Sequence, residues 1–425
     1  WSREIATCDA EYYRWNQWFF LRMLERGIAY RQKAPVNWCP SCKTSLSDDE
    51  VEHEDFDSHL WYIRYKIKGA DEYLTVATTR PETMLGDTAL AVSPKDPRYK
   101  KYVGKTAILP ILERELKIVA DSYVDPAFGT GVVKVTPAHD PNDFEIGKRH
   151  DLDEINILNE DGTLNENADR YKGLDRFDAR KRLLDDLTKK SHIEKIEKYS
   201  HAVGTCYRCH NMIEPYLSHQ WFVKMDELAK PAIDAVRTGK LRFHPDYWTK
   251  TYLHWMENIR DWCISRQLWW GHRIPIWYAE DGTMFVSFGR PTAQKCKGYD
   301  PATLVQDDDV LDTWFSSWLW PFSTFGWPDE TPELKKFYPT NVLVTGSEII
   351  FLWVARMVMA GYEFVGECPF SDVYIHGTVR DANGIKMSKS LGNGIDPVEV
   401  IEKHGADALR MSLVLATPDG QDPWL

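Results

Sequence analysis

The chain lacks an apolar segment long enough to cross a lipid bilayer. No apolar run reaches the roughly 18 residues that a transmembrane helix needs, and no secretory signal is visible at the N-terminus. An excess of basic residues is also absent, because 64 acidic residues against 52 basic ones give a net charge of −12. This balance argues against a broadly basic nucleic-acid binder but leaves room for local basic grooves. We therefore expect a cytoplasmic protein without membrane association.

Internal repeats and low-complexity segments are also missing, which argues against a repeat architecture. The chain has 425 residues, more than a single domain usually contains, and 43% of them are hydrophobic. Two or three domains, each with a core of its own, are therefore expected. This composition fits a large enzyme.

Eight cysteines are present, and four of them form two Cys-x-x-Cys pairs. Cys39 and Cys42 lie in NWCPSC, and Cys206 and Cys209 lie in TCYRCH. Two such pairs supply the four ligands of a tetrahedral structural zinc site, with His210 as an alternative ligand. Disulfides are less expected in a chain without a secretory signal. The long separation between the pairs indicates that a folded domain is inserted between them.

Between the two cysteine pairs, the sequence changes to short segments rich in β-branched and aromatic residues. Such segments, separated by turns, are typical of a compact β-rich domain of barrel-like form. The expected strands are residues 60–67, 73–79, 88–92, 117–120 and 132–136.

Helical spacing is found on both sides of this β-rich region. Residues 9–26 predict a helix that ends at Gly27, a C-terminal stop signal. Residues 169–187 and those that follow predict a second helix. Further on, a strand, a helix and a strand are expected at residues 341–346, 348–360 and 373–377. This βαβ pattern predicts a parallel sheet.

The pentapeptide KMSKS, residues 386–390, lies between Gly384 and Gly392 and follows an apolar run at residues 373–376. Two lysines and two serines on such a loop can bring ammonium groups and hydroxyl donors to a polyphosphate. A loop that closes while charge builds on the phosphates stabilises the transition state. A solvated basic turn is the alternative for an arbitrary pair of lysines, but the whole pentapeptide followed by Leu-Gly-Asn is much rarer.

Two polar motifs lie in the β-rich region: TTRPET at residues 78–83 and KVTPAHDPNDFEIGKRH at residues 134–150. In the second motif, Asp140 followed by Pro141 predicts the N-cap and first position of a helix. Asp143 then stands three residues on, as in a capping box. This arrangement accounts for both aspartates without any function.

A second interpretation of the two motifs is compatible with the first. Two carboxylates at a helix start can bind a polar ligand that carries an ammonium group. In that interpretation they face Thr78, Thr79 and Arg80 of the first motif.

The motifs resemble those of one enzyme family. KMSKS followed by LGN is similar to the signature loop of class I aminoacyl-tRNA synthetases, which activate an amino acid with ATP and pass it to tRNA. TTRPETMLGDTA and PAHDPNDFEIG resemble the editing domain of the valyl, isoleucyl and leucyl branches, which hydrolyses mischarged tRNA. The resemblance implies that Asp143 holds the α-amino group of the mischarged residue. It implies that the side chain or terminal ribose is recognised by Asp140, Lys134, Thr136 and Arg80.

The resemblance runs along essentially the whole chain and is greatest for the valyl branch. The discriminating segment is DTWFSS, residues 312–317, where the isoleucyl and leucyl branches tend to have DVWFDSG. The resemblance implies that Trp314, Ile349 and Trp353 line a valine pocket whose bulky walls exclude isoleucine. Ordinary core packing is the alternative for aromatic residues at this spacing. Glu348, also assigned to the amino-acid site, stands where the family usually has aspartate.

A valine pocket cannot strongly reject threonine, which differs from valine by a hydroxyl in place of a methyl, so a second, polar site is required. The resemblance implies ATP as a substrate with Mg²⁺, and structural Zn²⁺ at the cysteine pairs. It assigns catalytic roles to Lys386, Ser388 and Lys389 for activation and to Asp143 for editing. ATP binding is assigned to Lys386, Met387, Ser388, Lys389 and Ser390.

The implied fold is α/β: the second half of a Rossmann-like, nucleotide-binding catalytic domain, with zinc knuckles and an inserted β-barrel-like editing domain. The expected boundaries are 1–38 for a helical part of the catalytic domain, 39–58 and 201–220 for the two zinc-knuckle segments, 59–200 for the editing domain, and 221–425 for the second catalytic half with the KMSKS loop.

The implied function is that of a valine-tRNA ligase, which activates valine with ATP, transfers it to tRNA(Val) and edits Thr-tRNA(Val). The HIGH tetrapeptide of the family is not found, and no helical anticodon-binding domain follows. We therefore expect an internal section of a larger, monomeric enzyme, in which this chain alone retains only editing. A fragment of the isoleucyl branch and a non-catalytic tRNA-binding module are the alternatives.

Overall fold

The structure is a computed structural model that describes residues 4–388, 391–417 and 422–423. It contains two compact units: residues 30–222 with 263–269, and the remainder, which comprises residues 1–29, 223–262 and 270–425. We call the first the β-rich unit and the second the α/β unit. Among the described residues, no helix combines the length and the apolar character needed to span a membrane.

The β-rich unit is built around a seven-stranded sheet that closes almost into a barrel, as expected. The order is β4-β3-β6-β7-β5-β8, and β9 pairs with β3. Neighbouring strands are antiparallel except β5 and β7. The bounds are β3 (Val51–Ile67), β4 (Tyr73–Thr78), β5 (Ala89–Val92), β6 (Thr106–Ile108), β7 (Glu115–Ala120), β8 (Val132–Val135) and β9 (Ile193–Cys206).

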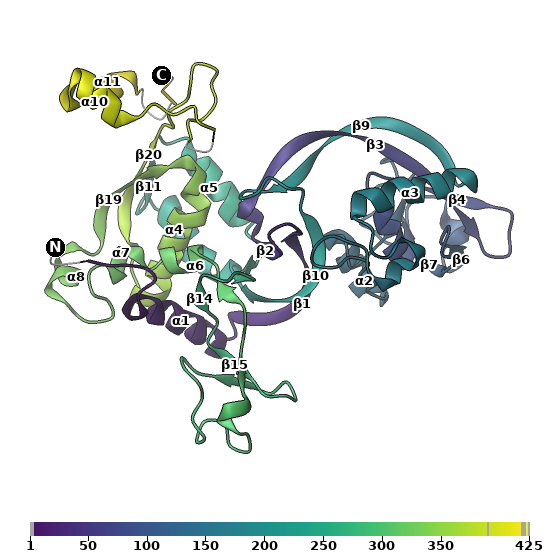
Figure 1. The fold of residues 1–425 in the computed structure, drawn as a ribbon, viewed down its shortest axis with the longest axis horizontal. Helices are drawn as coiled ribbons and strands as arrows, with labels where there is room; N and C mark the ends of the chain where they lie inside the picture. Colours follow the sequence, from purple (N-terminus) through teal and green to yellow (C-terminus); the bar gives the residue numbers. More distant parts are fainter. Residues whose placement is uncertain (1–3, 389–390, 418–421, 424–425) are drawn as a thin grey trace. The chain divides into compact units, whose positions relative to one another are not determined.

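All five predicted strands of this unit are confirmed. Alternating apolar residues give β4 and the second half of β3 a buried face, whereas β5 is apolar and buried at all four residues. In β3, Trp61, Ile63 and Tyr65 point into the core. The structure adds β6, which is only three residues long, and extends β3 well towards the N-terminus. This extension pairs with β9 as a long curved ribbon of two strands (Figure 1).

Two helices accompany the barrel, α2 (Pro141–His150) and α3 (Arg176–Lys189). The predicted second helix is confirmed over α3, whose Ala179, Leu183 and Leu187 pack into the barrel core. The prediction is wrong at both ends of this segment. Residues 166–171 form a 3₁₀ turn, and residues 193–206 form β9. Most of β9 is exposed, and its hydrogen bonds are made with β3, so its own sequence carries little apolar alternation.

The rest of the β-rich unit contains the cysteine pairs. Strands β10 (Glu214–Val223), β1 (Ala29–Cys39) and β2 (Thr44–Leu46) are neighbours, in that order, in a four-stranded sheet. Cys39 ends β1 and Cys206 ends β9. The two strand ends lie together, because both cysteines belong to one buried cluster. A small apolar cluster of Leu46, Val51 and Ile213 packs around the cysteines.

The α/β unit begins with α1 (Ala10–Glu25), which confirms the first predicted helix. Asp9 is its N-cap residue, and Gly27 follows with a φ of 68°. The parallel sheet is also confirmed: its order is β11-β20-β19, and all pairs are parallel. The bounds are β11 (Arg242–His244), β19 (Thr340–Gly346) and β20 (Phe370–His376).

The predicted helix between β19 and β20 is interrupted. It starts as a 3₁₀ turn, η6 (Ser347–Ile349), continues as a π-helical segment, η7 (Ile350–Ala355), becomes α9 (Arg356–Ala360) and ends in a second π-helical segment, η8 (Gly361–Val365). π-Helical segments inside helices are frequent at functional sites. The unit also contains α4 (Asp226–Arg237), α5 (Trp248–Glu257), α6 (Trp314–Ser317), α7 (Trp320–Ser323), α8 (Pro332–Phe337), α10 (Pro397–His404) and α11 (Ala406–Ala416).

Short strand pairs complete the α/β unit. Antiparallel pairing joins β14 (His272–Arg273) with β18 (Val310–Leu311). It also joins β15 (Ile276–Tyr278) with β16 (Met284–Val286) and with β17 (Val305–Gln306).

Candidate functional sites

The β-rich unit contains a cavity of about 640 Å³. Its walls come from the end of β4 and the turn that follows, the loop before β8, β8 itself and the start of α2, with further residues from β3 and β9. Six of the seven residues predicted for an editing site line this cavity: Thr78, Thr79, Arg80, Lys134, Asp140 and Asp143. Side chains more than 60 positions apart in the sequence therefore meet around one space.

Asp140 is the N-cap residue of α2, as predicted. Its Oδ1 accepts hydrogen bonds from the backbone N–H groups of Asn142 at 2.8 Å and Asp143 at 3.2 Å. Pro141 occupies the first helical position. The reciprocal half of a capping box is not formed, because the Asp143 carboxylate turns away from the cap and accepts a hydrogen bond from the Thr136 N–H at 2.9 Å. One aspartate therefore holds the helix, and the other is available to the cavity.

Asp143 is only 6% exposed, and this burial disfavours its charged form. Burial, together with the negative charges of Asp140 and Asp87, raises the pKa of Asp143 to about 7, although Lys134 and the Thr136 N–H act in the opposite direction. The carboxyl group thus changes its charge near neutral pH. A cation bound in the cavity would draw it into the carboxylate form.

Lys134 lies in β8 and lines the cavity, and residues behind the cavity wall hold its ammonium group in place. Its Nζ donates to the Thr136 hydroxyl at 2.6 Å, and that hydroxyl donates to Asp87 Oδ1 at 2.6 Å. Thr136, the seventh predicted editing residue, is fully buried and stands behind the cavity wall. Sequence reasoning missed Asp87, although it lies in the quoted string TTRPETMLGDTA.

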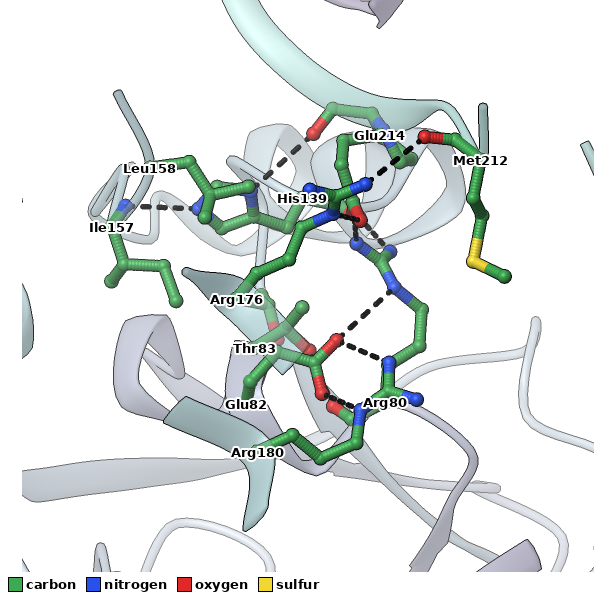
Figure 2. Close-up of polar contacts among 12 residues, drawn as sticks. Arg80, Glu82, Thr83, His139, Ile157, Leu158, Arg176, Arg180, Met212 and Glu214 are labelled. Atoms are coloured by element: carbon green, nitrogen blue, oxygen red, sulfur yellow. Dashed lines mark hydrogen bonds and ion pairs between the residues drawn. The ribbon is translucent and has the colours of Figure 1, made fainter. Parts of the chain in front are cut away.

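Arg80 lines the cavity and also belongs to a buried ion network (Figure 2). Its guanidinium group pairs with Glu214, which Arg176 also contacts at 2.7 Å. On its other side, Arg80 Nε lies 3.8 Å from Glu82, and Arg180 pairs with Glu82 at 2.6 Å. Both glutamates are 2% exposed. Three arginines and two glutamates therefore alternate and fix the orientation of Arg80.

His139 lies in the cavity wall but has no nitrogen free for catalysis. Its Nδ1 is 3.3 Å from the Pro215 carbonyl, and its Nε2 accepts a hydrogen bond from the Ile157 N–H at 2.9 Å (Figure 2). Burial, aided by the positive charges of Arg80 and Lys134, lowers the pKa of His139 to about 3. The imidazole is therefore neutral and ties the cavity wall to its surroundings.

The four predicted metal ligands gather at one point. The Sγ atoms of Cys39, Cys42, Cys206 and Cys209 all lie within 4.8 Å of one another, and Cys39 Sγ is 3.4 Å from Cys209 Sγ. Four thiolates around a zinc ion with bonds of about 2.3 Å are about 3.8 Å apart, so the set fits such an ion. All eight cysteines fall in the described part of the chain, and each is a free thiol. The alternative ligand His210 lies instead with Glu52 and Glu54.

The residues predicted for the amino-acid site lie on neighbouring segments of the α/β unit. Trp314 is in α6, Ile349 ends η6 and Trp353 is in η7; all three are half-buried. The Trp353 indole N–H donates to the Ser317 carbonyl at 3.0 Å, which joins η7 to α6.

The KMSKS segment is described up to Ser388; Lys389 and Ser390 lie outside the described residues. Lys386 Nζ contacts Glu348 Oε1 at 2.9 Å, so a predicted ATP ligand and a predicted amino-acid ligand form an ion pair. The Met387 N–H donates to the Val379 carbonyl, and the Ser388 N–H donates to the Asn393 side chain. These bonds hold the first part of the segment close to the end of β20.

Comparison with known proteins identifies the family of the chain. A family model described as tRNA synthetases class I (I, L, M and V) matches residues 1–424. The valine–tRNA ligase of Thermotoga maritima is 58% identical over 423 residues, which are 99% of this chain and 49% of the relative. That of Petrotoga mobilis is 57% identical over 99% of this chain and 48% of its own length.

Among solved structures, a ternary complex of the leucyl-tRNA synthetase of Agrobacterium radiobacter K84 matches with a TM-score of 0.48 and 19% identity, over 100% of this chain and 59% of that chain. The chain spans about half the length of the curated relatives that it matches. Because the family model covers nearly every residue, the chain belongs to the class I tRNA synthetases of the isoleucine, leucine, methionine and valine group.

Proposed function

We propose that this chain is part of a valine-tRNA ligase and that its β-rich unit hydrolyses Thr-tRNA(Val). The ligase assignment is supported by relatives of that name at 57% and 58% identity over nearly the whole chain. The editing assignment is carried by one observation: the buried Asp143 carboxyl group beside Lys134 and Asp140 in a cavity of about 640 Å³.

The cavity is suited to an aminoacyl ester with a free ammonium group. Asp143 would pair with that ammonium group, which favours the carboxylate form of a side chain whose pKa lies near 7 in the free protein. The half-buried Asp140 would bind the threonine hydroxyl, whereas valine offers it only a methyl group. Lys134 would attract the ribose and phosphate end of the tRNA.

Hydrolysis itself requires a water molecule to attack the ester carbonyl, breaking the bond to the terminal ribose. The proton from the water then passes to the ribose oxygen that leaves. His139 does not serve as the base, since both of its ring nitrogens are already bonded. Positioning by Asp143 and Asp140, together with assistance from a hydroxyl group of the tRNA, is therefore the mechanism that we propose.

In the whole ligase, the α/β unit would bind valine and ATP. Trp314, Ile349 and Trp353 would form the valine pocket, and their size would exclude isoleucine. Lys386, Met387 and Ser388, with Lys389 and Ser390, would contact the ATP phosphates and stabilise the pyrophosphate that leaves. A magnesium ion bound to ATP would supply further charge neutralisation.

The cysteine cluster would hold a structural zinc ion that joins the end of β1 to the end of β9. We expect the purified chain to contain a stoichiometric amount of zinc, and we expect Cys206→Ser to lose it. Elemental analysis measures both. Protein purified without chelators that contains no zinc would rule out this part of the proposal.

The editing proposal is tested by the release of amino acid from Thr-tRNA(Val) and Val-tRNA(Val) by this chain. We expect threonine to be released and valine to be retained. Asp143→Ala should abolish the release of threonine. Equal release of both amino acids, or unchanged activity of the variant, would contradict the proposal. ATP–pyrophosphate exchange tests the ligase reaction separately and is expected only in the longer enzyme.

A further inference from the structure

A buried carboxylate that the proposed reaction does not use lies behind the cavity wall. Asp87 is fully buried between the 3₁₀ turn η2 (Pro81–Gly86) and β5. Its Oδ2 accepts a hydrogen bond from the Tyr65 hydroxyl at 2.7 Å, and its Oδ1 accepts one from the Thr136 hydroxyl at 2.6 Å. Lys134 Nζ lies 3.5 Å from the same Oδ1. Burial raises the pKa of Asp87, whereas Lys134 and these two hydrogen bonds favour its charged form.

The local fold brings this carboxylate close to Thr136. Strands β5 and β8 are antiparallel, and the Thr88 N–H donates to the Val135 carbonyl at 2.9 Å. Gly86, the residue before Asp87, has no room for a side chain, since a Cβ atom there would lie 2.7 Å from the Ile155 carbonyl oxygen and 3.1 Å from Thr136 Cγ2. Glycine at this position therefore lets the turn approach β8 closely enough for the bond between Asp87 and Thr136.

Thr136 links Asp87 to two groups that line the cavity. Its hydroxyl accepts a hydrogen bond from Lys134 Nζ while it donates its own proton to Asp87. Its backbone N–H donates to the Asp143 carboxylate at 2.9 Å. A movement of Thr136 would thus displace both charged groups at once.

We propose that Asp87 is a positioning residue of the editing site: through Thr136, it fixes the Lys134 ammonium group and the N–H that holds the Asp143 carboxylate. This inference rests on the proposed editing function. Asp87 stands behind the wall rather than in the lining of the cavity, so it acts through these residues and does not touch the ligand.

The charge of Asp87 also affects the ionisation of Asp143. The negative charges of Asp87 and Asp140 oppose ionisation, and Lys134 favours it. The other titratable groups that line the same cavity are Arg80, Tyr123, Asp125, His139, Tyr199 and His201. In Asp87→Asn, one opposing charge is lost. This change favours the carboxylate, so the pKa of Asp143 should fall.

The test uses Asp87→Asn in the full chain, with the pKa of Asp143 followed by carboxyl-¹³C NMR. The Asp143 signal is assigned by its loss in Asp143→Asn. We expect the pKa to fall. The acid limb of the pH profile for Thr-tRNA(Val) deacylation should shift in the same direction. At high pH, kcat/KM should fall about tenfold because Lys134 and Asp143 are less well placed.

Thr136→Val serves as a second test of the proposal, and Asp121→Asn serves as its control. Thr136→Val removes only the hydroxyl link and should reproduce the loss of kcat/KM, which keeps the proposal testable if Asp87→Asn does not fold. Asp121 is also a buried aspartate, but it contacts Arg149 and His150 at the other end of α2. Asp121→Asn can loosen this helix without removing a charge next to Asp143, so it should leave the pKa of Asp143 unchanged.

An unchanged pKa of Asp143 in Asp87→Asn, or the same shift in Asp121→Asn, would overturn the inference. Full deacylation activity in Thr136→Val would overturn it as well. If the native chain releases no threonine at any pH, the proposed editing function fails. The NMR titration still decides in that case whether Asp87 controls Asp143.

Discussion

The charged groups of the cavity and those of the KMSKS segment are arranged in opposite ways. In the β-rich unit, Asp87 is fully buried, the Lys134 side chain is 11% exposed, and both are held by further hydrogen bonds. In the α/β unit, the side chains of Lys386 and Glu348 are 54% and 49% exposed. The first set is fixed before any ligand arrives, whereas the second is screened by solvent and easily separated.

This difference matches two kinds of chemistry. A site that distinguishes threonine from valine by a single hydroxyl needs polar groups held in place, because each misplaced or unpaired group weakens the discrimination. A loop that closes on a polyphosphate needs lysines that can leave one partner for another. Buried networks are therefore expected at the proposed editing cavity, and exposed pairs are expected on the segment proposed to close on ATP.

The largest effect is expected in the buried ion network behind Arg80. Glu214→Ala leaves the guanidinium groups of Arg80 and Arg176 without their shared carboxylate. Removing one partner of a buried pair typically costs about 3–5 kcal/mol of unfolding free energy. Urea denaturation of the chain, followed by circular dichroism, measures the loss.

The matched control for this variant is Glu115→Ala in the same unit. Glu115 pairs with Lys68, and both side chains are 55% exposed, so its removal should cost less than about 1 kcal/mol. If Glu214→Ala and Glu115→Ala had equal effects, burial would not distinguish the network, and the comparison between fixed and exposed charges would fail.

The next largest effect concerns the contribution of the Asp143 carboxyl group to the unfolding free energy, which changes with pH. Burial raises the pKa of Asp143 from an ordinary 3.8 to about 7, so the folded state holds its proton more tightly than the unfolded state. The contribution of Asp143 to the unfolding free energy therefore falls as pH rises from about 4 to about 7, and then stays constant. Asp143→Asn removes this dependence.

We expect Asp143→Asn to be more stable than the native chain at pH 8, on the order of 2–4 kcal/mol, and about equally stable at pH 4. Thermal unfolding across this pH range measures the difference. Deacylation of Thr-tRNA(Val) by the same variant should fall about a hundredfold or more, because an amide cannot pair with the ammonium group. A variant that lost stability at pH 8 would show that the carboxylate is well compensated in the fold.

Much of the fold was predictable because local pattern and tertiary structure agree. The strand β5 is a short, wholly apolar run, and the helix α1 carries apolar residues at helical spacing and ends before Gly27; both were confirmed. β9 was missed because its residues are mostly exposed and its hydrogen bonds are made with β3, which begins about 140 positions earlier. Strand pairing of this kind leaves almost no trace in the local sequence.

The candidate site was predictable to a similar extent. The motifs indicated Lys134, Asp140 and Asp143, and these residues line one cavity. The partners behind the wall were not indicated. Glu214 lies 134 positions from Arg80, and Asp87 lies 49 positions from Thr136. Each looks like an ordinary surface acid in the sequence, and only the folded chain shows that it is buried.

The smallest effect is expected for the exposed pair of Lys386 and Glu348. Partial burial acts to raise the pKa of Glu348, but its hydrogen bond with Lys386 and the charge of that lysine outweigh this effect and lower it. Because both side chains are about half exposed, Glu348→Gln should change the unfolding free energy by less than about 1 kcal/mol. Most of the change should disappear at high salt.

Denaturation of the native chain, Glu348→Gln, Lys386→Gln and the double variant, each at low and high salt, gives the coupling energy of the pair. A coupling above about 2 kcal/mol that persisted in salt would mean that Lys386 is held as firmly as Lys134. In the proposed ATP-binding role, a small, screened coupling would allow the Lys386 ammonium group to leave Glu348 for a phosphate.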